Sequence, residues 1–305
     1  MRIALIGQSD FGKDVLDALI KDQKNIVGVF CPPDSKEGQF DPIKESAQSH
    51  KIDLYQFGRL RDPDPITTFL SLNVDLCVMA FVTDIVPMEI INSPNLGTIQ
   101  YHPSLLPLHR GPSSMNWPII AGKKETGLSI FWPDDGLDTG PILLQKKVDI
   151  DDTDTLGTLY FKKLYPMGVD ALVEAVNLVS NNNAPKIDQD HSAATYEGWC
   201  KSENARIDWS KPAIEIYNLI RGCDPSPGAN TTLNSQKISF YKSHLSSEIS
   251  EMPYGTITSI NQNSFSVSAN EGSLTIERVK LAGKSKQYVA DFLKTTDIKI
   301  GDNFR

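Results

Sequence analysis

Short apolar runs alternate with amphipathic stretches along the first part of the chain. Residues 2–7 and 25–31 are apolar runs as long as a buried strand, and residues 11–20 between them place Val15, Leu16 and Leu19 at helical spacing. Three more strand-like runs follow, at residues 76–80, 97–101 and 127–132. This strand–helix alternation continues to about residue 181 and predicts a doubly wound α/β domain with a mostly parallel sheet.

The pattern changes after residue 181. Residues 181–185 read Asn-Asn-Asn-Ala-Pro, which breaks the periodicity and is typical of a linker. One helix is predicted within residues 209–222, and four β-rich runs follow at residues 237–241, 255–260, 264–269 and 273–280. Closely spaced strands after a helix predict a small β-barrel. We therefore expect a catalytic domain over residues 1–182, a linker over 183–204 and a second domain over 205–305.

Composition limits the functional classes. The 305 residues carry a formal net charge of −8 and no run of Lys or Arg longer than two, which argues against a nucleic-acid-binding surface. No stretch approaches the roughly 20 apolar residues that span a bilayer, and the first strand begins too early for a signal peptide. The four cysteines are widely spaced, so we expect reduced thiols in a cytoplasmic protein. No cluster has the spacing of metal ligands, and we predict no metal.

Three polar residues stand at strand ends. Gln100 and His102 are two apart in a strand and should project from one face. Asp138 follows the next strand, and the carboxyl ends of parallel strands form a ligand crevice, so we expect Asp138 and His102 to meet. A histidine transfers protons near neutral pH, and an aspartate can orient its ring and stabilise its cation. A glutamine amide can donate to an oxygen that becomes negative in a tetrahedral adduct.

The motifs around these residues resemble a known family. His-Pro-Ser-Leu-Leu-Pro at residues 102–107 and Asp-Gly-Leu-Asp-Thr-Gly at residues 135–140 resemble the folate-dependent formyltransferases. Residues 3–12, 195–198 and 219–222 extend the resemblance, which is greatest to the N-terminal hydrolase domain of 10-formyltetrahydrofolate dehydrogenase and is shared with methionyl-tRNA formyltransferase. The resemblance implies a Rossmann-like formyltransferase fold with a C-terminal OB-like β-barrel domain. It also implies 10-formyltetrahydrofolate as formyl donor.

The resemblance assigns roles to individual residues. His102, Asp138 and Gln100 are the expected catalytic residues, although most formyltransferases carry Asn and the hydrolase domain an aliphatic residue where this chain has Gln100. Two loops are expected to bracket the pterin of the folate, through Phe81, Asp84, Ile85 and Val86 on one side and Asp134, Asp135, Gly136 and Leu137 on the other. Arg110 either pairs with a carboxylate in its own domain or faces an anionic substrate group.

The formyl acceptor is left open between three substrates. Residues 32–41, where methionyl-tRNA formyltransferases carry a basic insertion, hold one lysine against three acidic residues. This disfavours tRNA as partner and favours water, with release of tetrahydrofolate and formate. Transfer to an amine remains the alternative, with methionyl-tRNA first and an amino sugar second. An alternative of another class is a folate-binding module without catalysis, against which the presence of both His102 and Asp138 argues.

Overall fold

The chain folds into two compact units. A computed structural model describes residues 1–34, 38 and 40–305. The first unit comprises Met1–Gly111, Gly127–Val148 and Lys162–Tyr196, and the second comprises Pro112–Thr126, Asp149–Phe161 and Glu197–Arg305. The units are thus built from interleaved segments, and the domain limits expected at residues 182 and 205 stay predictions.

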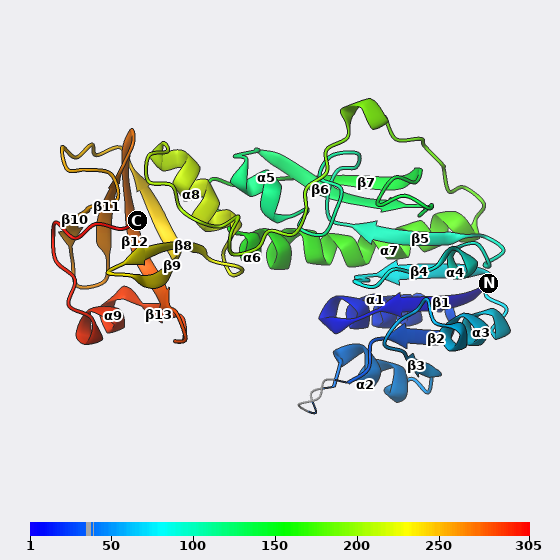
Figure 1. Ribbon diagram of the computed structural model, residues 1–305. Coiled ribbons are helices and arrows are strands. Elements are labelled where there is room, and N and C mark those ends of the chain that lie inside the picture. Colours follow the sequence, from blue (N-terminus) through cyan, green and yellow to red (C-terminus); the bar gives the residue numbers. More distant parts are fainter. Residues whose placement is uncertain (35–37, 39) are drawn as a thin grey trace. The chain divides into compact units, whose positions relative to one another are not determined.

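The first unit is built on a seven-stranded sheet of order β3-β2-β1-β4-β5-β6-β7 (Figure 1). Its strands are β1 (Arg2–Gly7), β2 (Asn25–Cys31), β3 (Leu54–Gln56), β4 (Leu76–Ala80), β5 (Thr98–His102), β6 (Glu125–Phe131) and β7 (Ile142–Asp149). Strands β3, β2, β1, β4 and β5 pair in parallel. The expected mostly parallel, Rossmann-like sheet is therefore confirmed.

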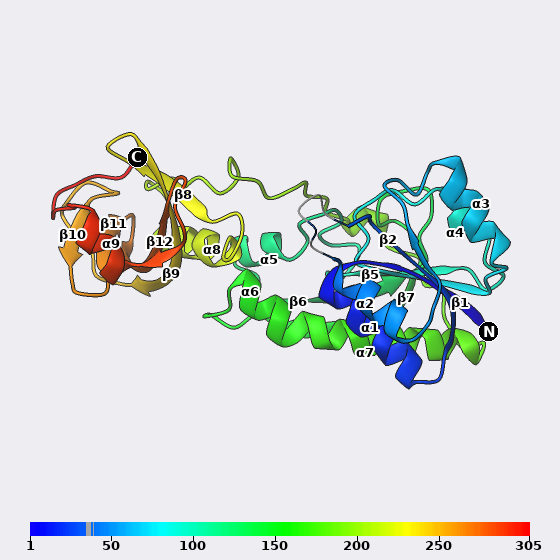
Figure 2. The same ribbon diagram turned by 90° about the horizontal axis from the view of Figure 1, so that it is seen from below.

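Helices cover both faces of this sheet (Figure 2). They are α1 (Ser9–Lys21), α2 (Pro42–Ser49), α3 (Pro63–Ser71), α4 (Met88–Ile91) and α7 (Tyr165–Ser180), with a 3-10 turn at His191–Ala193. Alternate strand residues point to opposite faces. Ile3 and Leu5 of β1 therefore join the apolar core under α1, α2 and α7, whereas Ala4 and Ile6 join the core under α3 and α4. Both faces are buried, which explains why the strands read as continuous apolar runs.

The turn from β1 into α1 requires close backbone packing. A Cβ atom on Gly7 would lie 2.8 Å from the carbonyl oxygen of Ala80 on β4, so only glycine fits there without a shift. The Asp41 carboxylate accepts from the Ser9 N–H at 2.8 Å and from the Ile43 N–H at 3.0 Å. One side chain thus satisfies N–H groups at the first turns of both α1 and α2.

Strand β6 runs in the direction opposite to the one expected. It pairs antiparallel with β5, with Gln100 opposite Phe131 and His102 opposite Ser129. The end of β6 therefore lies beside the start of β5, and Asp138 does not follow a carboxyl end at the same edge as His102. An apolar run alternates its side chains in the same way in either direction, so the sequence pattern could not reveal the direction of this strand.

The second unit holds an antiparallel sheet of order β10-β11-β12-β9-β8, with β13 paired to β12. Its strands are β8 (Ala229–Leu233), β9 (Gln236–Ser246), β10 (Ile257–Ile260), β11 (Phe265–Ala269), β12 (Gly272–Leu281) and β13 (Gln287–Tyr288). Its helices are α5 (Asn116–Ile120), α6 (Leu156–Leu159), α8 (Ala213–Gly222) and α9 (Val289–Thr295), and a π-helical turn, Tyr160–Leu164, joins α6 to α7.

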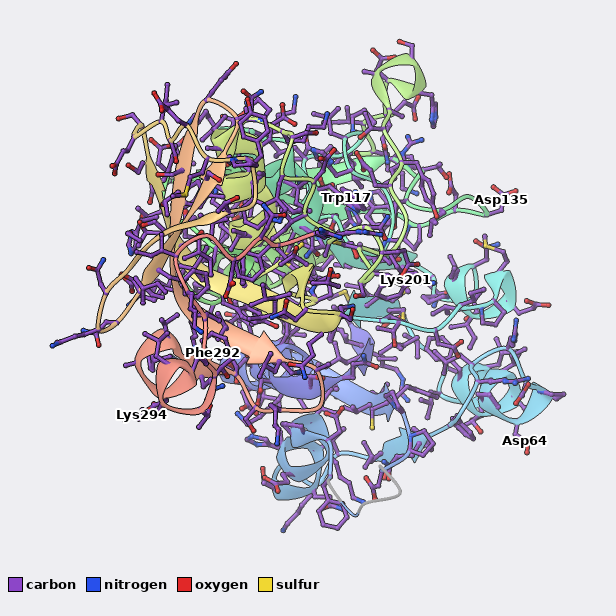
Figure 3. All side chains as sticks on the ribbon, turned by 60° about the vertical axis from the view of Figure 1, so that its left-hand side comes forward. Asp64, Trp117, Asp135, Lys201, Phe292 and Lys294 are labelled. Atoms are coloured by element: carbon purple, nitrogen blue, oxygen red, sulfur yellow. The ribbon has the colours of Figure 1, made fainter. Side chains whose placement is uncertain are left out.

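Aromatic side chains fill the core of this sheet. The rings of four residues contact one another there, two pairs stacked and three edge-to-face, with centroids 5.1 to 6.1 Å apart: Trp209, Phe240, Phe265 and Phe304. On α9, Phe292 is buried in the same core, whereas Lys294 lies on the exposed side of the helix (Figure 3).

The last residues of the chain bridge the two edges of this sheet. Thr232 of β8 and Arg305 exchange two backbone hydrogen bonds of 2.9 Å, and Ile257 of β10 donates to the carbonyl of Asp302 at 2.8 Å. Bridging both edges leaves fewer unpaired backbone groups, as in a small barrel. The expected C-terminal antiparallel β domain is confirmed.

Within the described residues, no helix is long and apolar enough to cross a membrane.

Candidate active site

His102 is the last residue of β5 and only 6% of its surface is exposed. The residue before it, Tyr101, points to the other face, where its ring packs 4.6 Å from that of Phe11 on α1. This packing fixes the strand, so that His102 is held on the opposite face, together with Gln100. A rigid strand is the kind of support that places a catalytic side chain accurately.

Both ring nitrogens of His102 face oxygen atoms. Nε2 lies 2.9 Å from the carbonyl oxygen of His109, and Nδ1 lies 3.7 Å from Oδ2 of Asp138. A carbonyl oxygen can only accept, so Nε2 carries the hydrogen of this bond. Nδ1 faces the carboxylate, which can stabilise positive charge when the ring gains a second proton.

The loop that presents the His109 carbonyl is held by buried hydroxyl groups. Ser104 Oγ donates to the carbonyl of Leu108 at 2.6 Å, and Ser129 Oγ of β6 donates to the carbonyl of Ser104 at 2.7 Å. Gln145 of β7 donates to the carbonyl of Leu106 at 2.8 Å. Carbonyls with such partners keep one conformation, so the His109 carbonyl oxygen that accepts the hydrogen bond from His102 Nε2 has a defined place.

Asp138 is as buried as His102, with 7% of its surface exposed. Its Oδ2 accepts from the Gly111 N–H at 2.9 Å, and its backbone has a φ of 56°, in the left-handed region. The loop between β6 and β7 folds back to bring this carboxylate to His102. The structure thus brings together the two residues that the sequence paired, by a route that the sequence did not predict.

Gln100 is half-buried and lies between Met79 of β4 and Phe131 of β6 in the sheet. Among the described residues, no hydrogen bond to its side-chain amide is found. A half-buried amide without a protein partner can bind a ligand, but its role in catalysis stays a prediction.

The two loops expected to hold the folate are both exposed at their tips. Phe81, with a φ of 60°, is 42% exposed and Ile85 is 68% exposed, whereas Val86 is buried. The Asp84 carboxylate is occupied by the N–H groups of Leu60 at 2.7 Å and of Ile85 at 2.8 Å. Each oxygen of this carboxylate thus accepts one backbone hydrogen bond, which shapes the loop.

The second loop is organised in the same way. Asp134 Oδ1 accepts from the Gly136 N–H at 3.1 Å and from Thr139 Oγ1 at 2.6 Å, so this residue also shapes its own turn. Leu137 is 56% exposed, and Figure 3 shows Asp135 on the outer part of the loop. In the described part of the chain no hydrogen bond joins this loop to Phe81–Val86.

A cavity of about 290 Å³ lies beside the first loop. It is lined by residues from the ends of β1, β2 and β3 and by the loop after β4, among them Gly7, Gln8, Phe30, Phe57, Phe81 and Thr83. The loop at 134–138 does not line it. The folate site between the two loops therefore stays a prediction.

Among the described residues Arg110 pairs with no carboxylate, so the first of its two expected roles is wrong, and the second, facing an anionic substrate group, stays a prediction. It is buried and donates to Gln189 Oε1 at 2.7 and 3.3 Å and to His191 Nδ1 at 3.0 Å. Its side-chain partners among the described residues are thus neutral. Gln189 and the Gly111 N–H are parts of the site that the sequence analysis missed, because neither belongs to a motif with a recognisable spacing.

The described residues contain no group of three or more His, Cys, Asp or Glu side chains that could hold a metal ion. The site is therefore an arrangement of one imidazole, one carboxylate and ordered backbone groups, with exposed apolar side chains on the neighbouring loops. It is suited to moving a proton and to stabilising a tetrahedral adduct.

Comparison with protein families agrees with this geometry. A family model described as formyl transferase matches residues 1–176, and a second, described as formyl transferase, C-terminal domain, matches residues 200–297. The chain belongs to the formyl transferase family. The two matches together cover both sheets.

Relatives in this family carry different names. A mitochondrial 10-formyltetrahydrofolate dehydrogenase of Mus musculus is 45% identical over 250 residues, which is 80% of this chain and 27% of that protein. The cytosolic 10-formyltetrahydrofolate dehydrogenase of Homo sapiens is also 45% identical, over 80% of this chain and 28% of that protein. The chain thus spans little more than a quarter of the length of these dehydrogenases. A methionyl-tRNA formyltransferase of Clostridioides difficile (strain 630) is 34% identical over 99% of each chain.

Solved structures share the fold of this chain. HypX from Aquifex aeolicus in complex with tetrahydrofolic acid has a TM-score of 0.70 at 14% identity, covering 100% of this chain and 51% of that one. WlaRD, a sugar 3N-formyl transferase, has a TM-score of 0.69 at 20% identity, covering 93% of this chain and 99% of that one. At these identities the likeness concerns the fold alone.

Proposed function

We propose that this protein takes the formyl group from 10-formyltetrahydrofolate and passes it to water, releasing tetrahydrofolate and formate. The observation that carries this proposal is the buried contact between His102 Nδ1 and Asp138 Oδ2 at 3.7 Å, at the end of β5. An imidazole next to a carboxylate is suited to general acid–base catalysis at neutral pH. Names of relatives support the folate, since 10-formyltetrahydrofolate dehydrogenases are 45% identical to this chain.

The proposed reaction proceeds through a tetrahedral adduct. Water adds to the formyl carbon while His102 takes a proton from its oxygen, and Asp138 stabilises the resulting imidazolium. The bond from the formyl carbon to N10 of the folate then breaks, N10 receives the proton from His102, and formic acid leaves and releases its remaining acidic proton to solvent as formate. The Gln100 amide donates to the formyl oxygen while that oxygen carries negative charge.

The proposed folate site uses the two exposed loops. Phe81 and Ile85 on one loop and Leu137 on the other are large apolar side chains with 42%, 68% and 56% of their surface exposed. Exposed apolar side chains flanking a catalytic pair are suited to cover a flat ring, with backbone groups reading its edge. Asp84 and Asp134 would act through the shapes they impose on the two loops.

Water is the preferred acceptor for two reasons. The net charge of −8 and the acidic composition of residues 32–41 are unfavourable for tRNA, although residues 35–37 and 39 of this segment lie outside the described residues. The second reason is the resemblance of the catalytic motifs to the hydrolase domain of 10-formyltetrahydrofolate dehydrogenase.

Transfer to methionyl-tRNA is the second candidate. It is favoured by the match to a methionyl-tRNA formyltransferase over 99% of both chains, which includes the second unit. Transfer to an amino sugar follows, since a sugar 3N-formyl transferase shares the fold. Both alternative functions use the same formyl donor and the same His102–Asp138 pair.

The decisive experiment follows tetrahydrofolate and formate with 10-formyltetrahydrofolate as substrate, with and without methionyl-tRNA or an amino-sugar nucleotide. We expect equal amounts of tetrahydrofolate and formate without any amine, at a rate that His102→Gln lowers by roughly a hundredfold or more. If the release of tetrahydrofolate instead requires methionyl-tRNA, and its rate falls steeply as salt is added, methionyl-tRNA is the formyl acceptor. Folate binding without turnover under all conditions would establish a non-catalytic module.

We also propose a cytoplasmic location. The four cysteines are widely spaced along the sequence and include no Cys-x-x-Cys motif, which is typical of proteins of a reducing compartment. The sulfur atoms of Cys200 and Cys223 lie 3.9 Å apart, close enough to join if the surroundings were oxidising. Mass spectrometry of the protein isolated under acid quench checks this, because a Cys200–Cys223 disulfide in freshly lysed cells would contradict it.

A further inference from the structure

The backbone of Asp138 needs support from its surroundings. Its φ of 56° lies in the left-handed region, where the Cβ of a residue other than glycine approaches the following carbonyl. Such a conformation persists only when neighbouring groups hold it. The position of the Asp138 carboxylate against His102 depends on this backbone, so the groups that hold it influence the proposed chemistry.

Gln189 supplies this support from a distant part of the sequence. Its Nε2 donates to the carbonyl of Asp138 at 3.0 Å and to the carbonyl of Gly140 at 2.7 Å. Only 5% of the Gln189 surface is exposed, so water has little access to replace these bonds. Both hydrogens of the amide are therefore used on the turn that carries Asp138.

A short backbone pairing brings Gln189 to this turn. Ile187 and Ile142 at the start of β7 exchange two backbone hydrogen bonds, of 2.7 and 2.9 Å. The indole N–H of Trp132 donates to the carbonyl of Pro185 at 2.9 Å. The segment before Gln189 is thus fixed at two points, just after the end of β6 and at the start of β7. These points lie on either side of the loop that contains Asp138.

Arg110 determines which way the Gln189 amide points. A guanidinium has only donors, so Oε1 of Gln189 must face it and Nε2 must face the two carbonyls. Gly111, the next residue, donates to the Asp138 carboxylate. A closed ring of contacts therefore joins Arg110, Gln189, Asp138 and Gly111. This ring holds both the backbone and the carboxylate of Asp138.

We propose that Gln189 is a positioning residue, oriented by Arg110, that holds Asp138 against His102. This inference rests on the proposed function, because it assigns a purpose to the placement of a catalytic pair. Gln189 acts through the backbone of Asp138 and does not itself touch the reacting atoms. Partners of this kind, which orient a catalytic group, typically change activity by roughly 10- to 100-fold when they are replaced.

The test is Gln189→Glu, which keeps the shape of the side chain and its contact with Arg110. The second carboxylate oxygen would then face the carbonyls of Asp138 and Gly140, where the amide had donated. We expect kcat to fall roughly 10- to 100-fold with KM for 10-formyltetrahydrofolate changed less than about threefold. In an Asp138→Asn background the same change should have almost no further effect, because both substitutions act on one group.

A second readout does not depend on turnover. The Gly111 N–H is held by the Asp138 carboxylate, so its hydrogen exchange should become about tenfold faster or more in Gln189→Glu. The matched control is Asn116→Asp in the second unit, since the buried Asn116 amide also donates to two backbone carbonyls, those of Gly222 at 2.9 Å and Ser226 at 3.4 Å. This control should leave both kcat and the exchange of Gly111 unchanged.

The outcomes separate this inference from the proposed function. Normal turnover and unchanged Gly111 exchange in Gln189→Glu would overturn the inference and leave the proposed function standing. Absence of turnover in the wild type would overturn the proposed function, whereas faster Gly111 exchange would still support the role of Gln189 in holding the turn. If Gln189→Glu does not bind tetrahydrofolate, Gln189→Asn replaces it. Its amide is one methylene too short to keep all its contacts, and full activity in this variant would also refute the inference.

Discussion

Replacing Asp138 by Asn removes one negative charge from the site and almost nothing else. The amide oxygen of Asn can still accept from the Gly111 N–H, as Oδ2 of Asp138 does at 2.9 Å. The same oxygen would face Nδ1 of His102, because Oδ2 of Asp138 makes both contacts. A neutral amide oxygen attracts an imidazolium less strongly than a carboxylate oxygen does.

The size of the effect follows from the distance between the two groups. At the observed 3.7 Å, an imidazolium and a carboxylate attract each other by roughly 1 kcal/mol at the dielectric constant of water and by roughly 4.5 kcal/mol at an effective value of about 20. Both side chains are 7% exposed, which places the pair near the second value. We therefore expect kcat to fall by about 100- to 2,000-fold, since each 1.36 kcal/mol is about tenfold in rate.

The assay is the initial rate of tetrahydrofolate formation from 10-formyltetrahydrofolate, with KM measured alongside. KM should change less than about threefold, because the charge acts on the protonated ring that forms during the reaction. The thermal midpoint should stay the same or rise, because Asn removes a buried charge. Asp154→Asn is the matched control, since Asp154 is also buried and accepts from the Asp151 N–H at 2.9 Å in the second unit, and its kcat should stay within about twofold.

A kcat above one-tenth of the wild-type value in Asp138→Asn would refute this reasoning. It would mean that the ring of His102 does not become positively charged in the rate-limiting step, or that Asp138 serves only to hold the loop. A large increase in KM with normal kcat would point to the second of these readings.

Three further predictions concern Gln100, the proposed folate loop and the cysteines. Gln100→Ala should lower kcat by about 5- to 160-fold, because a lost hydrogen bond to the formyl oxygen costs roughly 1–3 kcal/mol. A change of kcat below twofold in steady-state kinetics would show that the amide points elsewhere. Ile85→Asp should raise the dissociation constant of tetrahydrofolate, measured by calorimetry, by about tenfold or more, because a charge would replace apolar surface at the proposed pterin site, and unchanged affinity would move the folate elsewhere. Alkylation at pH 7.5 followed by mass spectrometry should label Cys200 first, because a hydrogen bond from a neighbouring buried thiol lowers its pKa and increases its thiolate fraction. Cys31 and Cys77 should react last, since burial raises the pKa of each to about 12 and leaves them as thiols, and labelling of either before Cys200 would contradict this order.

Much of the architecture could be predicted from the chain itself. The runs at β1, β2 and β4 coincide with observed strands, because a strand buried on both faces must be apolar at nearly every position. The four β runs predicted in the second unit correspond to β9, β10, β11 and β12, and several of them are bounded by turn residues, whereas β8 and β13 were not predicted. His102 and Asp138 were found through the motifs that contain them.

What the sequence left undecided depends on contacts between distant residues. The direction of β6 leaves no trace in the alternation of its side chains, so the route by which Asp138 reaches His102 could not be foreseen. Gln189 lies 51 residues after Asp138, within a segment that reads as a linker, and a single glutamine there has no periodic pattern. Its bonds to Asp138 and Gly140 exist only because the pairing of Ile187 with Ile142 brings these segments together. Local patterns determine which segments become strands and helices, whereas the orientation of a buried amide or carboxylate is determined by partners that become neighbours only when the chain folds.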